Sequence, residues 1–193
     1  MMKRRFARPA GGFVCLSVLL ALAALTAGVA SAGKPAATLT CTGIVSTGTW
    51  GNVVVPDGAE CRLNGRAIQG NVRVGTGSDL YVDGGSIAGN LFASGADEVV
   101  TGISLGQAHI YGNVTVDSTG FVGFDGPIDG NASFTNNDFV QLVPPGAHIG
   151  GNASFTGNGV VQLIGLGVGS NLACSGNATV IKISVTVGGH DSC

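Results

Sequence analysis

One short motif recurs along most of the chain. Asparagine follows glycine at six corresponding points and follows serine at a seventh: Asn52, Asn71, Asn90, Asn113, Asn131, Asn152 and Asn171. The spacing between successive asparagines is nearly constant, and the hexapeptide GNASFT occurs at both 130–135 and 151–156. Self-similarity with a period of about 20 residues is typical of proteins that stack one structural unit on the next.

Each unit alternates as strands do. One and three residues after each asparagine the side chain is apolar or small, and the residue between them is generally more polar, as in Val72-Arg73-Val74. A second alternating triplet follows a turn, for example Leu80-Tyr81-Val82 and Ile181-Lys182-Ile183, and an aliphatic residue precedes the next asparagine by three. Three short strands per unit predict an all-β, single-stranded parallel β-helix of about seven coils of about 20 residues. Precedent favours a right-handed winding, and a β-propeller is the alternative, although its blades need about 40 residues.

The repeated asparagines are expected to stack. Glycine permits the backbone angles of a tight corner, and an asparagine amide can hydrogen-bond to the coils above and below it. We therefore predict that the seven asparagines form a structural ladder along one corner of the helix. A ligand-binding row is the alternative role for them.

The segment 1–32 has the pattern of a secretory signal peptide. A basic cluster, an apolar run and the small residues of Ala30-Ser31-Ala32 precede Gly33. A retained anchor helix is the alternative. Cleavage would leave a β-helix domain at 33–193 with 5 basic and 11 acidic residues, a net charge of 5 − 11 = −6. We expect a secreted, cell-surface or periplasmic protein with no further membrane span and, because it has no basic stripe, no nucleic-acid partner.

The cysteines test the repeat. Four follow the leader, and Cys61 follows Cys41 at nearly the same interval as Cys193 follows Cys174. Each interval matches the spacing of the asparagines, about one coil, so each pair is expected in vertically adjacent strands. We predict a disulfide in the first coil and another in the last.

Chemically active groups are sparse. Glu60, Asp79 and Glu98 each stand eight residues after an asparagine, so they would form a vertical acidic row, either solvated at a turn or binding a cation such as calcium. His109 and His148 lie two coils apart, too far to share a metal. The outward strand positions hold Arg62, Arg73 and Lys182 but no paired carboxylates, so no catalytic residue, cofactor or confident metal site is assigned.

The pattern I-x-G-N-h-x-h (h, hydrophobic), seen in IQGNVRV and IYGNVTV, resembles short-coil bacterial parallel β-helix proteins, including the polymer-forming bactofilins. The resemblance spans 50–187 and implies a structural role, although the leader and the cysteines depart from the cytosolic bactofilin pattern. We expect an exported, non-catalytic solenoid acting as a structural, adhesive or self-assembling surface module.

Two kinds of partner follow from this expectation. An uncovered edge at the last coil would allow end-to-end association of copies. The alternative function is a carbohydrate-active enzyme or sugar-binding β-helix, with a glycan ligand and calcium as a further possibility. Asp83 and Asp125 are the residues to test for that alternative.

Overall fold

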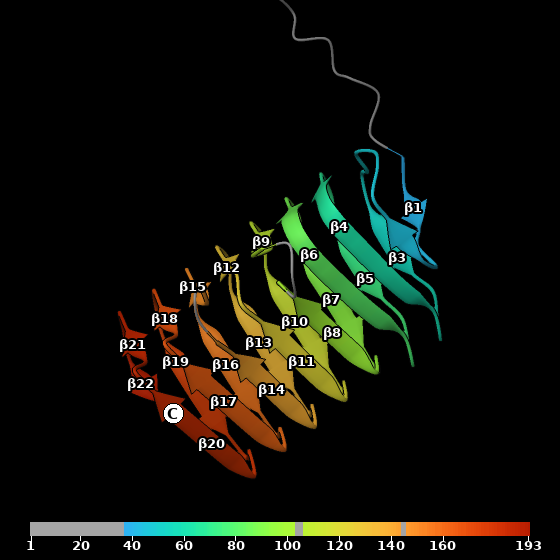
Figure 1. Ribbon diagram of the computed structural model, residues 1–193. Coiled ribbons are helices and arrows are strands. Elements are labelled where there is room, and N and C mark those ends of the chain that lie inside the picture. The colour runs from blue at the N-terminus through green and yellow to red at the C-terminus, as the bar shows by residue number, and fades with distance from the viewer. Residues whose placement is uncertain (1–36, 103–105, 144–145) are drawn as a thin grey trace, which may run out of the picture. The chain divides into compact units, whose positions relative to one another are not determined.

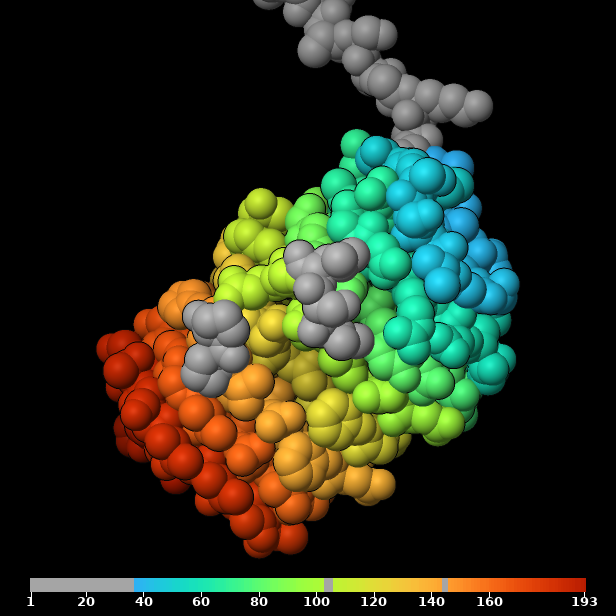
Figure 2. All heavy atoms as spheres, in the orientation of Figure 1, coloured from blue at the N-terminus to red at the C-terminus, as the bar shows by residue number. Residues whose placement is uncertain are grey.

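The computed structural model describes residues 37–102, 106–143 and 146–193. The predicted signal peptide lies outside the described residues. Within them the chain forms strands joined by turns, and no helix occurs. Successive coils lie side by side from the first strand to the last, and the surface colours follow the chain in the same order (Figures 1 and 2). The chain is therefore a parallel β-helix, as its repeat predicts.

One strand of each coil belongs to a nine-stranded sheet, here called sheet A. Every pair in it is parallel. In spatial order its strands are β1 (Leu39–Thr40), β3 (Val53–Val55), β5 (Val72–Val74), β7 (Leu91–Ser94), β10 (Val114–Asp117), β13 (Ala132–Thr135), β16 (Ala153–Thr156), β19 (Leu172–Ser175) and β22 (Asp191–Ser192).

The other strands form a thirteen-stranded sheet, sheet B, which covers two faces of the coil. Its first face contains β2 (Ile44–Val45), β4 (Glu60–Ile68), β6 (Asp79–Ile87), β8 (Glu98–Thr101), β11 (Phe121–Phe124), β14 (Phe139–Leu142), β17 (Val160–Ile164) and β20 (Thr179–Ile183). Its second face contains the ends of β4 and β6, then β9 (His109–Ile110), β12 (Pro127–Ile128), β15 (His148–Ile149), β18 (Gly167–Val168) and β21 (Thr186–Val187).

The three faces agree with three strands per coil, with two refinements. In β4 and β6 the second and third strands run together, and each bends at glycines of positive φ, Gly65 at 61° and Gly84 at 72°. The solenoid has about eight turns, and not seven, because β1 and β2 add a partial coil before Asn52. That coil lacks the Gly-Asn signature, so counting asparagines missed it.

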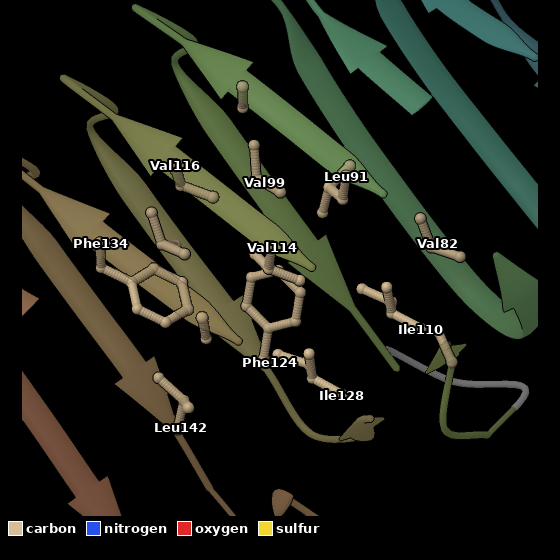
Figure 3. Close-up of a cluster of buried hydrophobic side chains, with 14 of the residues drawn as sticks. Val82, Leu91, Val99, Ile110, Val114, Val116, Phe124, Ile128, Phe134 and Leu142 are labelled. Atoms are coloured by element: carbon tan, nitrogen blue, oxygen red, sulfur yellow. The ribbon is translucent and has the colours of Figure 1, made fainter. Parts of the chain in front are cut away.

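The core is a stack of aliphatic and aromatic side chains (Figure 3). Ile68, Ile87, Ile110, Ile128 and Ile149 occupy one buried column, each paired with the next along the second face of sheet B. The two GNASFT hexapeptides lie in register, so that Ala132, Ser133, Phe134 and Thr135 face Ala153, Ser154, Phe155 and Thr156. The rings of Phe134 and Phe155 stack with centroids 5.1 Å apart. The duplication therefore reflects like residues stacked on like.

One predicted register is wrong. The sequence pattern aligns Ile181-Lys182-Ile183 with Val161-Gln162-Leu163, whereas the structure pairs Val161 with Val180 and Leu163 with Lys182. A one-residue shift moves each side chain to the opposite face. Lys182 thus takes an inward position in the last coil, and Ile181 faces outward with 39% of its surface exposed. The apolar run Val180-Ile181 allowed either alignment.

The repeated asparagines stack at one corner. The Oδ1 of Asn71 accepts hydrogen bonds from the backbone N and the Nδ2 of Asn90, at 2.8 and 3.0 Å. The backbone bond recurs at each step from Asn52 to Asn171, where the last acceptor binds the amide of His190 at 2.8 Å. The side-chain amides therefore hydrogen-bond to neighbouring coils, which is a structural role.

A second asparagine ladder lies inside the solenoid, and sequence reasoning missed it. Asn137 and Asn158 are each 1% exposed. The Oδ1 of Asn158 accepts from the backbone N and the Nδ2 of Asn137, at 3.0 and 2.9 Å. Asn177 continues the ladder by accepting from Asn158. The signal was present as an asparagine six residues after each of Asn131, Asn152 and Asn171.

Candidate functional site

The outward face of sheet A carries a varied group of side chains. Arg73 of β5 pairs with Phe92 of β7, which pairs with Thr115 of β10. These are outward positions of their strands, so alternation turns all three side chains away from the core. The guanidinium carbon of Arg73 lies 5.1 Å from the Phe92 ring centroid, within range of a cation–π contact.

Two shallow hollows adjoin on this face. One, of about 270 Å³, is lined by Arg73, Phe92, Ser94, Thr115 and Asp117 together with the neighbouring Val74 and Ala93. The other, of about 300 Å³, is lined by Thr38, Asn52, Val53, Val54, Asn71 and Arg73. Arg73 borders both. The face therefore presents an aromatic ring, a guanidinium group and hydroxyl groups around two hollows that share Arg73.

Asp117 is the acidic residue that lines the hollow beside Phe92. It ends β10 and is half-buried. Its Oδ2 accepts a hydrogen bond from Ser118 Oγ at 3.0 Å, and its Oδ1 accepts one from Asn136 Nδ2 at 3.4 Å. These contacts orient the carboxylate at the rim of the hollow beside Thr115.

The predicted acidic row is present on sheet B. Glu60, Asp79 and Glu98 pair directly with one another in β4, β6 and β8. Arg62 contacts Glu60 at 2.5 Å, and the Tyr81 hydroxyl donates to Glu98 Oε2 at 2.6 Å. Partial burial and the neighbouring acids, first Asp97 and then Glu98 and Glu60, raise the pKa of Asp79.

The structure does not arrange the acidic row as a metal site. Across the described ranges, no group of three His, Cys, Asp or Glu side chains is arranged to hold a metal ion. Two of the three acids are engaged by Arg62 and Tyr81 instead. The spacing that suggested calcium aligns the backbones, but side-chain direction decides coordination.

Asp83 and Asp125, the acids to test for enzymatic activity, flank Gly102. The register places Gly102 between them, and a Cβ on Gly102 would collide with Asp125 Oδ1, so the Asp125 carboxyl occupies the space above that glycine. Burial, followed by the nearby Asp83, raises the pKa of Asp125. Asp83 is only 7% exposed. Asp125 is half-buried.

The two histidines that precede the isoleucine column lie apart. His109 is in β9 and His148 in β15, with β12 between them. His109 Nε2 lies 2.9 Å from Asp129 Oδ1, and its ring stacks on Tyr111 with centroids 3.9 Å apart. The two histidines do not share a site.

The cysteines pair as the spacing predicts, Cys41 with Cys61 and Cys174 with Cys193. The second disulfide joins vertically adjacent positions of sheet A, since the register that pairs Ala173 with Ser192 continues to Cys174 and Cys193. The first does not, because Cys41 follows β1 of sheet A and Cys61 lies in β4 of sheet B. Its Cα atoms are nevertheless 5.5 Å apart, and both residues are buried.

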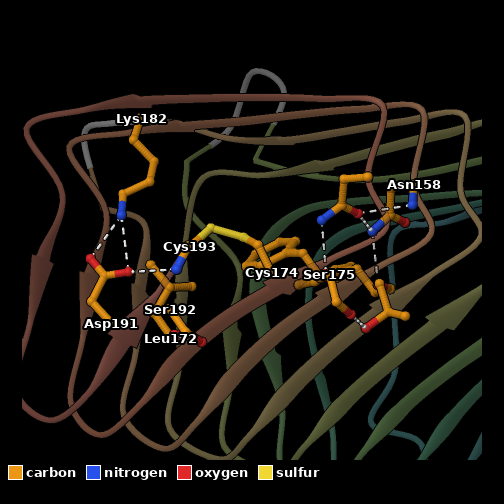
Figure 4. Close-up of a disulfide and its surroundings, with 12 residues drawn as sticks. Asn158, Leu172, Cys174, Ser175, Lys182, Asp191, Ser192 and Cys193 are labelled. Carbon is orange, nitrogen blue, oxygen red and sulfur yellow. Dashed lines mark hydrogen bonds and ion pairs between the residues drawn. A yellow bond between two sulfur atoms is a disulfide. The ribbon is translucent and has the colours of Figure 1, made fainter.

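The last coil is closed by polar groups (Figure 4). Lys182 and Asp191 occupy inward positions, below Leu163 and Leu172 respectively. Lys182 Nζ binds the Asp191 carboxylate oxygens at 2.7 and 3.0 Å, and this contact lowers the pKa of Asp191. Asp191 Oδ1 also accepts from the backbone N of Cys193 at 3.0 Å. An ion pair and a disulfide thus lie together in the last described coil.

Comparison with family models, curated proteins and solved structures found no match. Within the residues that the structure describes, no helix is long and apolar enough to cross a membrane.

Proposed function

We propose that the chain is an exported, non-catalytic structural module that contacts other molecules through its lateral faces. Two disulfides support an oxidising location, because such bonds persist mainly outside the cytosol. The asparagine ladder and the stacked core support a rigid scaffold. The bactofilin-like repeat implies a polymer-forming role. The proposed module does not polymerise.

The observation that carries the proposal is the polar closure of the last coil. If a second copy stacked on this end, Lys182 and Asp191 would be enclosed between coils. Enclosing charged groups carries a desolvation penalty that their mutual attraction often fails to offset. Inward-pointing charges on edge strands are a known protection against edge-to-edge pairing.

The same edge would otherwise favour association. Strand β20 exposes Val180, Ile181 and Ile183 by 37, 39 and 51%. Apolar side chains on an unpaired strand favour addition of another strand. The ion pair is therefore the element that separates a lateral binding module from a filament subunit.

Light scattering and electron microscopy on the purified mature protein test this proposal, over a range of concentrations and with or without calcium. The wild-type protein should remain monomeric. The double variant Lys182→Leu/Asp191→Leu should associate end to end, since it makes the terminal positions apolar. The matched control replaces another exposed ion pair with leucines, Arg62→Leu/Glu60→Leu. It should leave the size of the protein in solution unchanged. Rods of the wild-type protein would overturn the proposal.

A further inference from the structure

We propose that the face of sheet A between β3 and β10 binds a neutral polysaccharide chain, with Phe92 as the stacking platform and with Arg73 and Asp117 binding its hydroxyl groups. This inference rests on the proposed function, and it supplies the ligand class and the surface of that lateral contact. It follows from three features of the face.

The first feature is the ring. Phe92 is the aromatic residue in the outward middle column of sheet A, and it is half-buried. The Arg73 guanidinium lies over its ring, and the ring lines the hollow that it shares with Thr115. Arg73 and Thr115 lie above and below it and are exposed. Binding sites for small polar molecules combine apolar and aromatic surface with a few placed polar groups. The C–H face of a pyranose ring fits the aromatic surface, and its hydroxyl groups fit the polar residues.

The second feature is the pair of opposite charges on the two sides of the ring. A guanidinium group donates two hydrogen bonds in a fixed fork, and a carboxylate accepts two. Adjacent hydroxyl groups on a sugar can both donate and accept, so they satisfy either group. Asp117 is held in place by Ser118 and Asn136, which limits the entropy lost when a ligand binds.

The third feature is length. The adjoining hollows extend over β3, β5, β7 and β10. Three strand spacings of about 4.8 Å give roughly 14 Å, the span of a few sugar rings and more than one sugar needs. Beyond β10 the face continues with the hydroxyl groups of Ser133, Thr135, Ser154 and Thr156. A chain-like ligand fits this surface better than a compact one.

Charge selects a neutral chain. The domain at 33–193 carries 5 basic and 11 acidic residues, a net charge of 5 − 11 = −6. The negative net charge would repel an acidic polysaccharide. Within the hollow, the negative charge of Asp117 offsets the positive charge of Arg73. Binding should therefore change little with ionic strength.

The test uses the full mature domain with its disulfides formed. Cellohexaose and chitohexaose are titrated by calorimetry, insoluble cellulose and chitin are used in depletion assays, and polygalacturonate is the acidic comparison. At least one neutral glycan should bind, and Phe92→Ala should weaken that binding at least tenfold. Arg73→Ala should weaken it by a similar factor. Arg73 is exposed, so its variant tests the site independently of any effect of Phe92→Ala on folding.

Sheet B offers matched controls. Arg62 lies 4.2 Å from the Tyr81 ring centroid, so the same two kinds of side chain also stack there. Arg62→Ala and Tyr81→Ala should leave glycan affinity within twofold of the wild-type value. Binding lost equally in the sheet B variants would overturn the assignment, as would binding to polygalacturonate alone or to none of the glycans. If the wild-type protein stays monomeric but binds no glycan, only this inference fails; if it forms rods, the proposed function itself fails.

Discussion

The two halves of the solenoid use the same interior and different exteriors. From β13 to β17 outward positions repeat, as in Ser133 on Ser154, and Gln141 Nε2 donates to Gln162 Oε1 at 2.9 Å. In the first half the corresponding columns change at each coil, as in Arg73, Phe92 and Thr115. Inward strand residues remain mainly apolar in both halves up to the last coil, where Lys182 and Asp191 are inward. The difference teaches that the stack constrains the interior, and that the first half is free to carry recognition chemistry.

The turns between the sheets differ as well. The second half buries Asn137 and Asn158, which link successive coils, whereas the first half buries Ser78, Ala96 and Thr119 at the corresponding turns. Side-chain amides bond to each other and to backbone carbonyls, which the smaller residues do less extensively. Coil-to-coil coupling is therefore stronger where the exterior is more regular.

The largest expected loss of stability follows removal of a disulfide, and the two disulfides can be compared because they close loops of similar size. Each should contribute about 3 kcal/mol by chain entropy. Cys41 and Cys61 are 1 and 0% exposed, so the double serine variant there also buries hydroxyl groups and should lose more stability than Cys174→Ser/Cys193→Ser. Urea unfolding of both variants measures the difference. Equal losses would show that burial of the first pair contributes nothing.

Reduction kinetics provide a second measurement on the same pairs. Cys174 and Cys193 are half-buried, whereas the first pair is enclosed. Thiol–disulfide exchange requires access to sulfur. Mild reductant with alkylation and mass spectrometry should label Cys174 and Cys193 first, and the reverse order would contradict the expected accessibility.

A smaller effect separates the two asparagine ladders. Asn158→Ala removes the partner of the Phe134 carbonyl, 3.0 Å from Asn158 Nδ2, and of the Asn137 amide, all within the core. We expect a loss of about 3 kcal/mol, since buried unpaired groups carry a large penalty. Asn152→Ala on the exposed ladder is the matched control and should cost about 1 kcal/mol, because water replaces its partners. Similar losses in urea unfolding would refute a special role for the buried ladder.

The smallest effect concerns two acids with opposite pKa shifts. The pKa of Asp79 is raised in the folded state, so its ionisation opposes folding above its unfolded pKa, and the penalty disappears as pH falls. The pKa of Asp191 is lowered by Lys182, so its contribution is favourable above its unfolded pKa and is lost as pH falls through the folded value. At pH 7, Asp79→Asn should raise Tm and Asp191→Asn should lower it, each by about 1–3 °C.

Melting curves of these two variants from pH 7 down to pH 3 check the signs. Both differences from the wild-type protein should shrink toward the acid end of the series. A Tm shift of the same sign for both variants at pH 7 would contradict the opposite environments of the two carboxyls.

Much of the fold could be predicted because the inward residues recur at a regular interval along the sequence. The repeat interval in the sequence is enough to predict that Val53 pairs with Val72 and Cys174 with Cys193. Prediction failed where that signal weakened. The partial coil of β1 and β2 lacks its asparagine, and two consecutive apolar residues, Val180 and Ile181, left the alignment of β20 open.

The candidate site was less predictable. The sequence identified Arg73 as outward and Glu60, Asp79 and Glu98 as a row, but it offered no reason to join Arg73 and Phe92 with Asp117. Residues two apart in a strand share a face, and residues one repeat apart share a column, so the group emerges only after both relations are combined. Side-chain direction then decides that the acids contact Arg62 and Tyr81 rather than converging on an ion.

The sequence by itself determined the parallel stack, its period, the corner asparagines and the cysteine pairs, because each depends on spacing along the chain. Only the tertiary structure decided that Lys182 and Asp191 meet at the last coil and that Asp83 is enclosed. It also decided that the first disulfide joins a residue that follows sheet A, Cys41, to Cys61 of sheet B. These outcomes depend on which side of a strand faces inward and on what covers it, and a shift of one residue reverses both.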